Sequence, residues 1–284
     1  MRPMTERTMK LAMIQMRVEP GDKAANLRRA SQLLADAARA GAQVALLPEA
    51  LNTSWTDLRA RTLADAVPDG ETCSVLRQAA QAHQLHVCAG LVERDPHGRL
   101  FNSAVLVGPD GKVLLRHRKI YELEIAHEAY ALGDGLAVAD TKWGRIGVMI
   151  CADALAPGHV ISRTLGLMGA AVILSPCAWA VAADHDNAKE PYGQLWRDHY
   201  GPVARDFRLW IAGASNVGPI HTGPWAGRRC IGCSLLVGPD GQQVQGPYGE
   251  EAETLVHAEL TLAPRPARGD GWERLLPGKK PVML

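Results

Sequence analysis

The sequence lacks the features that mark nucleic-acid-binding proteins. Only two of its 284 residues are phenylalanine, and aromatic residues make up 5% of the chain. The formal net charge is +1, so no global field draws the protein to nucleic acid or to an anionic membrane. Neither a basic stripe nor an aromatic platform is present, and we therefore expect no nucleic-acid partner.

Long apolar segments are missing as well. The sequence has no run of about 18 apolar residues, the length that a bilayer requires, and no apolar signal-peptide segment follows the charged N-terminus. These absences predict a protein of the cytoplasm without membrane association, whose cysteines are free thiols rather than a disulfide framework. The six cysteines are Cys73, Cys88, Cys151, Cys177, Cys230 and Cys233.

Strand and helix patterns alternate along the chain, which predicts an α/β fold. The apolar content of 47% is ordinary for a globular protein with a sizeable core. Strands are expected at residues 10–16, 42–48, 86–93, 145–151, 171–175, 210–216 and 255–260. Helices are expected at residues 23–40, 72–83, 160–168 and 196–208.

One turn motif occurs twice. Gly-Pro-Asp-Gly at residues 108–111 returns at residues 238–241, and each copy is flanked by strand-like residues, which predicts two β-hairpins. The repeat indicates either two similar β-rich halves or the coincidence of a common turn. No Pro/Gly/Ser linker separates the halves, so we predict one domain over residues 1–284, with a core at about 10–262 and a tail at 263–284.

Three chemically reactive side chains end apolar runs that are far apart in the sequence. Glu49 follows a short buried strand, Lys119 follows a hairpin and Cys151 ends the strand predicted at residues 145–151. A thiol is a weak nucleophile until a base or a nearby cation favours its thiolate. An acid, an amine and a thiol in these positions predict a cysteine hydrolase.

Six motifs in the chain extend this pattern. They are Pro48-Glu49, the segment Arg118-Lys119-Ile120-Tyr121, Glu128 followed by Gly135, Gly147 with Cys151 and Asp153, Ala204-Arg205, and Gly232-Cys233-Ser234 with Pro239 and Gly241. In this combination the chain resembles the nitrilase superfamily, the carbon–nitrogen hydrolases, over roughly residues 10–262. The resemblance implies a four-layer α-β-β-α sandwich that assembles into homodimers or larger homo-oligomers through an outer helical layer.

The resemblance also implies the catalytic roles. Cys151 would attack a carbonyl or nitrile carbon, and Glu49 would move the protons. Lys119 and the backbone N–H of Ala152 would stabilise the developing negative charge. Glu128 would hold Lys119 or the substrate amide through charge-assisted hydrogen bonds. Neither a metal nor another cofactor is required.

Aromatic residues near these segments are expected to bind the substrate. Trp55, Tyr121, Trp179 and Trp196 are the predicted pocket residues, together with Ala152; ordinary packing is the alternative for the aromatic ones. No arginine follows Asp153, although one there would be a natural clamp for a substrate carboxylate. This absence argues against a carbamoyl amino acid.

Three other motifs allow a second interpretation. The Cys230-x-x-Cys233 pair could bind zinc or act in redox chemistry, but without a second pair core packing is favoured. The basic cluster at residues 116–119 could bind phosphate, although it lacks a Gly-rich loop. His185 and Asp186 could bind a metal, or they could lie in a solvated loop.

The sequence therefore predicts a small-molecule amidase that releases ammonia through a thioester on Cys151. A nitrilase or an N-carbamoyl amidase with the same three residues is the alternative within the family. A catalytically silent binding protein on the same fold is the alternative outside enzymes. The substrate is accordingly expected to be a small amide, carbamoyl compound or nitrile.

Overall fold

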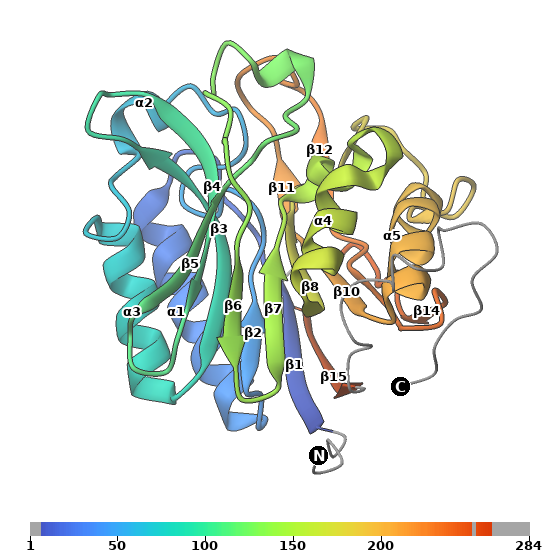
Figure 1. Cartoon of the computed structure of the whole chain (residues 1–284). Coiled ribbons are helices and arrows are strands. Elements are labelled where there is room, and N and C mark those ends of the chain that lie inside the picture. The colour runs from blue at the N-terminus through green and yellow to red at the C-terminus, as the bar shows by residue number, and fades with distance from the viewer. Residues whose placement is uncertain (1–6, 252–253, 263–284) are drawn as a thin grey trace, which may run out of the picture.

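Two six-stranded sheets form the centre of the computed structural model, which describes residues 7–251 and 254–262 (Figure 1). The first sheet has the order β15-β1-β2-β3-β4-β5, and the second has the order β14-β13-β10-β8-β7-β6. The strands of the first sheet are β1 Arg7–Gln15, β2 Val44–Leu46, β3 His86–Arg94, β4 Leu100–Val107, β5 Val113–Arg118 and β15 Thr254–Leu262. Those of the second are β6 Val138–Thr141, β7 Gly144–Val148, β8 Ala170–Cys177, β10 Trp210–Ser215, β13 Leu235–Val237 and β14 Gln243–Gln245.

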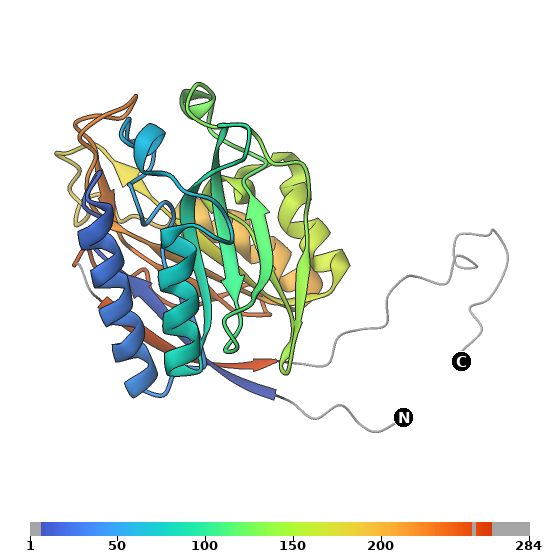
Figure 2. The ribbon, with the colours of Figure 1, turned by 90° about the vertical axis from the view of Figure 1, so that its left-hand side faces the viewer.

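Helices cover the outer face of each sheet (Figures 1 and 2). Helices α1 (Lys23–Arg39) and α3 (Glu71–His83) pack on the first sheet, and α4 (Val160–Met168) and α5 (Gln194–Phe207) pack on the second. The remaining elements are short: α2 Ala60–Leu63, the 3₁₀ helices η1 Glu124–Ala126, η2 Cys151–Leu155 and η3 Pro157–His159, and a small sheet of β9 Ala180–Val181, β11 Val217–Pro219 and β12 Arg229–Ile231. The helix–sheet–sheet–helix order is the predicted four-layer sandwich.

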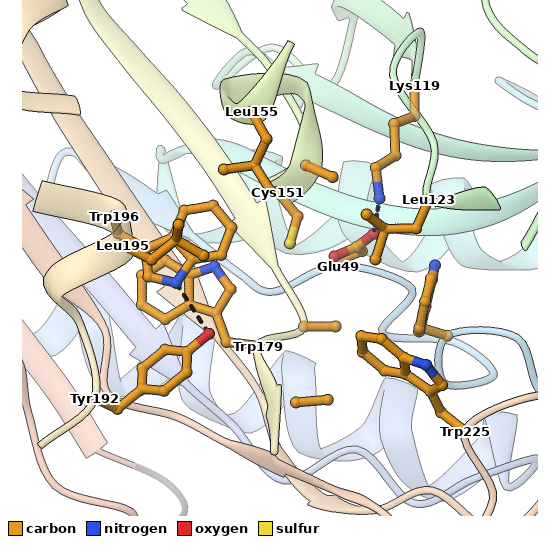
Figure 3. A pocket seen from close by; sticks show the side chains of 14 residues that line it. Glu49, Lys119, Leu123, Cys151, Leu155, Trp179, Tyr192, Leu195, Trp196 and Trp225 are labelled. Atoms are coloured by element: carbon orange, nitrogen blue, oxygen red, sulfur yellow. Dashed lines mark hydrogen bonds and ion pairs between the residues drawn. The ribbon is translucent and has the colours of Figure 1, made fainter. Parts of the chain in front are cut away.

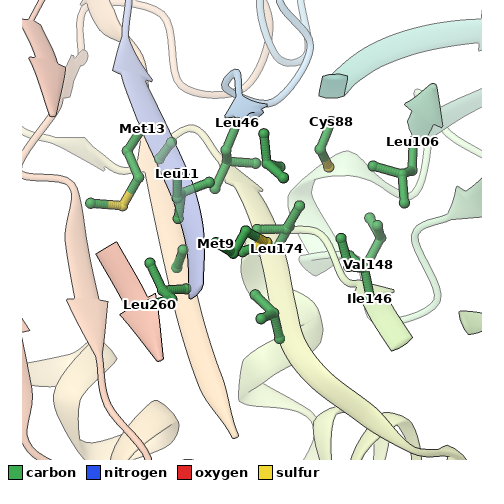
Figure 4. Packing of buried hydrophobic residues seen from close by; sticks show 14 of the residues in the cluster. Met9, Leu11, Met13, Leu46, Cys88, Leu106, Ile146, Val148, Leu174 and Leu260 are labelled. Atoms are coloured by element: carbon green, nitrogen blue, oxygen red, sulfur yellow. The ribbon is translucent and has the colours of Figure 1, made fainter. Parts of the chain in front are cut away.

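The layers hold together because both faces of each sheet are apolar. Between the sheets, Met9 and Leu11 of β1 share one buried cluster with Val148 of β7 and Leu174 of β8 (Figure 4). Separate clusters fill the space between each sheet and its helices. Burial of this surface is the main favourable contribution to folding. Packing of the two sheets also brings the end of β2 in one sheet close to the end of β7 in the other.

All the strands and helices that the periodicity predicts are present, and both Gly-Pro-Asp-Gly turns connect hairpin strands, β4 to β5 and β13 to β14. One boundary prediction was wrong. The strand expected at residues 145–151 ends at Val148, and Cys151 begins η2. The predicted tail at residues 263–284 lies outside the described residues. In the described ranges, no helix combines the length and the apolar character needed to cross a bilayer.

Candidate active site

The predicted reaction centre is built from the ends of three strands. Glu49 follows β2 and Lys119 follows β5 in the first sheet, whereas Cys151 follows β7 in the second. All three side chains line one pocket with a volume of about 240 Å³. Figure 3 shows them around the same hollow. The thiol therefore meets the carboxylate and the ammonium across the boundary between the sheets.

The backbone around Glu49 is held by neighbouring strands. The Glu49 N–H donates to the carbonyl of Cys177 at 3.2 Å, and the Gly90 N–H donates to the carbonyl of Pro48 at 3.0 Å. Strand β3 passes so close that a Cβ on Gly90 would lie 2.5 Å from the Cα of Glu49. Only glycine permits this approach, so strand pairing positions the buried carboxylate.

Lys119 lies between two carboxylates. Its Nζ is 2.9 Å from Oε1 of Glu49 and 2.9 Å from Oε1 of Glu122. The side-chain amide of Asn102 donates to the same two carboxylates, at 2.6 Å to Glu49 and 3.1 Å to Glu122. All four residues are buried. This closed network leaves the ammonium little freedom to move.

The network shifts two pKa values upward. Burial alone would lower the pKa of Lys119, but the charges of Glu122 and Glu49 outweigh it and hold that pKa well above its ordinary value. Burial raises the pKa of Glu49, and the charge of Glu122 adds to the increase, although Lys119 and Asn102 oppose it. A charged ammonium therefore lies beside a carboxylate that binds a proton more readily than usual.

Cys151 occupies a sharp turn. Its φ of +42° lies in the left-handed region, which is uncommon for residues other than glycine and costs about 1–3 kcal/mol. Cys151 as a residue is partly exposed, whereas the other five cysteines, all in the described part of the chain, are buried. Burial of its sulfur raises the pKa of Cys151 well above its usual range, and the neighbouring Cys177 and Glu49 contribute. The resting group at neutral pH is thus a thiol.

Asp153 joins the turn at Cys151 to the segment that carries Lys119. Its Oδ1 accepts from the N–H groups of Ile120 and Tyr121 at 3.1 and 2.9 Å. Its Oδ2 accepts from the N–H of Ile150 at 2.8 Å and lies 2.7 Å from Nε2 of His117. Burial would raise the pKa of Asp153, but His117 and the backbone donors outweigh it and lower the pKa. This carboxylate sets the spacing between nucleophile and ammonium.

Four of the five predicted substrate-binding residues line the pocket: Trp55, Ala152, Trp179 and Trp196. The wall also contains two aromatic residues, Tyr192 and Trp225, that the sequence did not single out. Aliphatic side chains complete it, from Leu123, Leu155, Leu195, Ala178 and Ala180. The pocket surface is therefore mainly apolar, and Glu49 and Lys119 are its charged side chains among the described residues.

Two predicted site residues lie elsewhere. Tyr121 is 38% exposed and does not line the pocket, and its backbone N–H donates to Asp153. Glu128 is exposed on the chain after η1 and does not line the pocket. The carboxylate that contacts Lys119 belongs to Glu122, three residues after it.

Sequence reasoning missed Glu122, Asn102 and Trp225. Glu122 follows Lys119 closely, but nothing in the sequence distinguishes it from Glu124 or Glu128. Asn102 lies in β4 and reaches the site because β4 pairs with β5. Trp225 comes from the loop between β11 and β12. These three depend on contacts between distant segments.

The structure supports none of the alternative phosphate, zinc or metal sites among the described residues. Arg116 and Arg118 lie beside the buried carboxylate of Glu93, with contacts of 3.3 and 3.2 Å, so the basic cluster is paired rather than open to phosphate. Cys230 and Cys233 are both buried, as core packing predicts. Across residues 7–251 and 254–262, no group of three or more His, Cys, Asp or Glu side chains is placed to hold a metal ion.

Known proteins share this fold and sequence pattern. The family model for carbon–nitrogen hydrolases matches residues 10–265. A nitrilase from Pyrococcus abyssi is 31% identical over 257 residues, which cover 89% of this chain and 90% of that protein. The ω-amidase NIT2-A of Xenopus laevis is 34% identical over 153 residues, and this match spans about half of each chain, 51% here and 55% there.

The fold has a matching solved structure. The crystal structure of Nit3 from Saccharomyces cerevisiae, a member of branch 10 of the nitrilase superfamily, superposes with a TM-score of 0.76, 23% sequence identity and coverage of 96% of both chains. The two sheets and the outer helices thus agree with the family match, which covers most of the chain. On these grounds the chain belongs to the carbon–nitrogen hydrolase family of the nitrilase superfamily.

Proposed function

We propose that this carbon–nitrogen hydrolase is a small-molecule amidase, which releases ammonia through a thioester on Cys151. The observation that carries the proposal is the meeting of Glu49, Lys119 and Cys151 in one pocket, with the Glu49 carboxylate 2.9 Å from the Lys119 ammonium. The likeness to an ω-amidase supports amide rather than nitrile chemistry.

In the first half of the reaction, the Cys151 sulfur attacks the amide carbon while its proton passes to Glu49. The raised pKa of Glu49 makes it a stronger base than an ordinary carboxylate. Lys119 stabilises the negative charge on the amide oxygen, and Glu122 holds Lys119 in place. The C–N bond then breaks, Glu49 gives the proton to the nitrogen, and ammonia leaves a thioester behind.

In the second half, water attacks the thioester carbon. Glu49 takes a proton from the water, the C–S bond breaks, and the proton returns to the sulfur. The products are a carboxylic acid and the free thiol. Because the same carboxylate is acid and base in turn, its position between the pocket and Lys119 serves both halves.

Ammonia release from a panel of short aliphatic, aromatic and carbamoyl amides, with the matching nitriles, tests the proposal. We expect turnover of amides and little ammonia from nitriles. Preferred turnover of nitriles would identify a nitrilase instead, the second candidate, which the 31% identity to a nitrilase over most of the chain favours. Binding without turnover of any compound would identify a silent binding protein.

The pH dependence of kcat/KM is expected to show an acid limb above the range of an ordinary glutamate. Glu49 must be ionised to accept the thiol proton, and burial raises its pKa, so activity is lost as the pH falls through that raised value. No rise should accompany thiolate formation at alkaline pH, since Cys151 reacts as a thiol. A rate that instead climbs steadily with pH would mean that a free thiolate is the nucleophile.

The assembly and the location remain proposals. The resemblance to the nitrilase superfamily implies a homodimer or a larger homo-oligomer, and the cytoplasm is the proposed location. A small amide is the proposed partner.

A further inference from the structure

The charged side chains around the nucleophile are mostly of one sign. Lys119 is the one cationic side chain among the described residues that line the pocket, and its ammonium contacts the carboxylates of both Glu49 and Glu122. With all three groups ionised, the cluster carries a net negative charge. A carboxylate on a substrate would therefore meet repulsion, and none of the described lining residues offers it a cation that is not already paired.

Aromatic rings line two sides of the pocket, and aliphatic side chains complete it. On one side the rings of Trp179 and Trp196 stack with centroids 4.7 Å apart and an interplanar angle of 18°. The indole N–H of Trp196 donates to the hydroxyl of Tyr192 at 3.0 Å, whereas the indole nitrogens of Trp179 and Trp55 are buried without a hydrogen-bond partner. Figure 3 shows Trp225 on the other side of the hollow, where it meets Trp55 edge to face at 4.9 Å.

We propose that the substrate amide carries an uncharged, apolar acyl group, which lies between these walls, and that the pocket rejects amides whose acyl group ends in a carboxylate. The inference rests on the proposed amidase function. The cavity of about 240 Å³ holds about eight water-sized groups at roughly 30 Å³ each, enough for a short branched or aromatic acyl group. Apolar contact with the rings stabilises such a group, whereas an unpaired carboxylate loses its hydration there.

Arg228 is the cation that could weaken this selectivity. Its guanidinium lies over the Trp225 ring, 5.0 Å from the centroid, but the residue is exposed and does not line the pocket. A charge in that position is hydrated and screened by salt, so it offers little compensation to a carboxylate inside the pocket.

The test compares two amides of nearly equal size and shape, 4-methylpentanamide and succinamate. They have the same number of non-hydrogen atoms, and a carboxylate in succinamate replaces the isopropyl end of the other. We expect kcat/KM for 4-methylpentanamide to be higher by about 10²-fold or more, because the site leaves the carboxylate unpaired. Equal or preferred turnover of succinamate would overturn the inference.

Adding a cation to the pocket provides the matched test. Leu195 lines the pocket on α5 and is 47% exposed, so Leu195→Arg places a guanidinium at the wall without burying it. The variant should raise kcat/KM for succinamate relative to 4-methylpentanamide by about tenfold, with a gain that shrinks at high salt. Leu167→Arg is the control, because Leu167 is exposed on α4 and lies outside the pocket.

The outcomes separate this inference from the amidase proposal. If the protein hydrolyses neither these two amides nor any other amide in the panel, the amidase function itself is refuted. Hydrolysis of succinamate at least as fast as its uncharged counterpart would leave the amidase function standing and refute the selectivity. If Arg228→Gln then removed the turnover of succinamate, the carboxylate clamp would be Arg228.

Discussion

Cys151→Ala is expected to abolish ammonia release from every amide that the wild-type protein hydrolyses. Without the sulfur no thioester can form, and removal of the nucleophile from a hydrolase costs on the order of 10⁶ in kcat. The fold should survive, since Cys151 is partly exposed and alanine is smaller. Intact-mass spectrometry during turnover should show an acyl adduct on the wild-type protein and none on the variant.

Cys73→Ala is the matched control for the loss of a thiol. Cys73 belongs to α3 and is buried in the cluster between that helix and the first sheet, so its substitution should leave kcat near the wild-type value. Iodoacetamide should modify Cys151 before the five buried cysteines and inactivate the protein as it does so. Full ammonia release by Cys151→Ala would refute the proposed mechanism.

Glu122→Gln is expected to lower kcat by about 10²–10³-fold, the usual cost of weakening one group that stabilises the oxyanion. Glu122 contacts Lys119 rather than the pocket surface, so KM should change little. The substitution also removes the charge that contributes most to the raised pKa of Lys119. That pKa should fall, and an alkaline limb should appear at lower pH than in the wild-type protein, because activity is lost as Lys119 releases its proton.

Glu128→Gln tests whether the acid that supports Lys119 is Glu122, as the structure indicates, or Glu128, as the sequence motif suggested. Glu128 is the acid that the family pattern suggested, yet its side chain is exposed and outside the pocket, so the variant should match the wild-type protein in kcat and in pH profile. A large loss of kcat in Glu128→Gln with none in Glu122→Gln would assign the role to Glu128 after all. Thermal unfolding of both variants checks that any loss is not one of folding.

Periodicity predicted the helices and strands well because it reports a local property. The apolar stripe on residues 23–40 predicts a helix without any knowledge of the surface that it packs against, and α1 occupies Lys23–Arg39. The predicted end of β7 was less accurate. The apolar residues continue to Ile150, but the carboxylate of Asp153 accepts the Ile150 N–H and the backbone turns there. A side-chain contact ended this strand before the apolar pattern did.

The identity of the second acid could not be predicted in the same way. Glu122, Glu124 and Glu128 all follow Lys119 in a stretch with little regular structure, and distance along the chain does not separate them. Glu122 is buried against Lys119 because Asn102, from a neighbouring strand, donates to its carboxylate. Tyr121 illustrates the same limit, since its aromatic character suggested a pocket residue, but the residue is exposed and lies outside the pocket.

The order of strands and helices, and the positions of Glu49, Lys119 and Cys151 at strand ends, follow from the sequence alone, because they depend on neighbouring residues. Which acid accompanies Lys119, which tryptophans face the nucleophile and how little positive charge surrounds it were decided by the tertiary structure. Those features arise where two sheets and several loops meet, and the packing between segments distant in the chain determines which side chains are buried there.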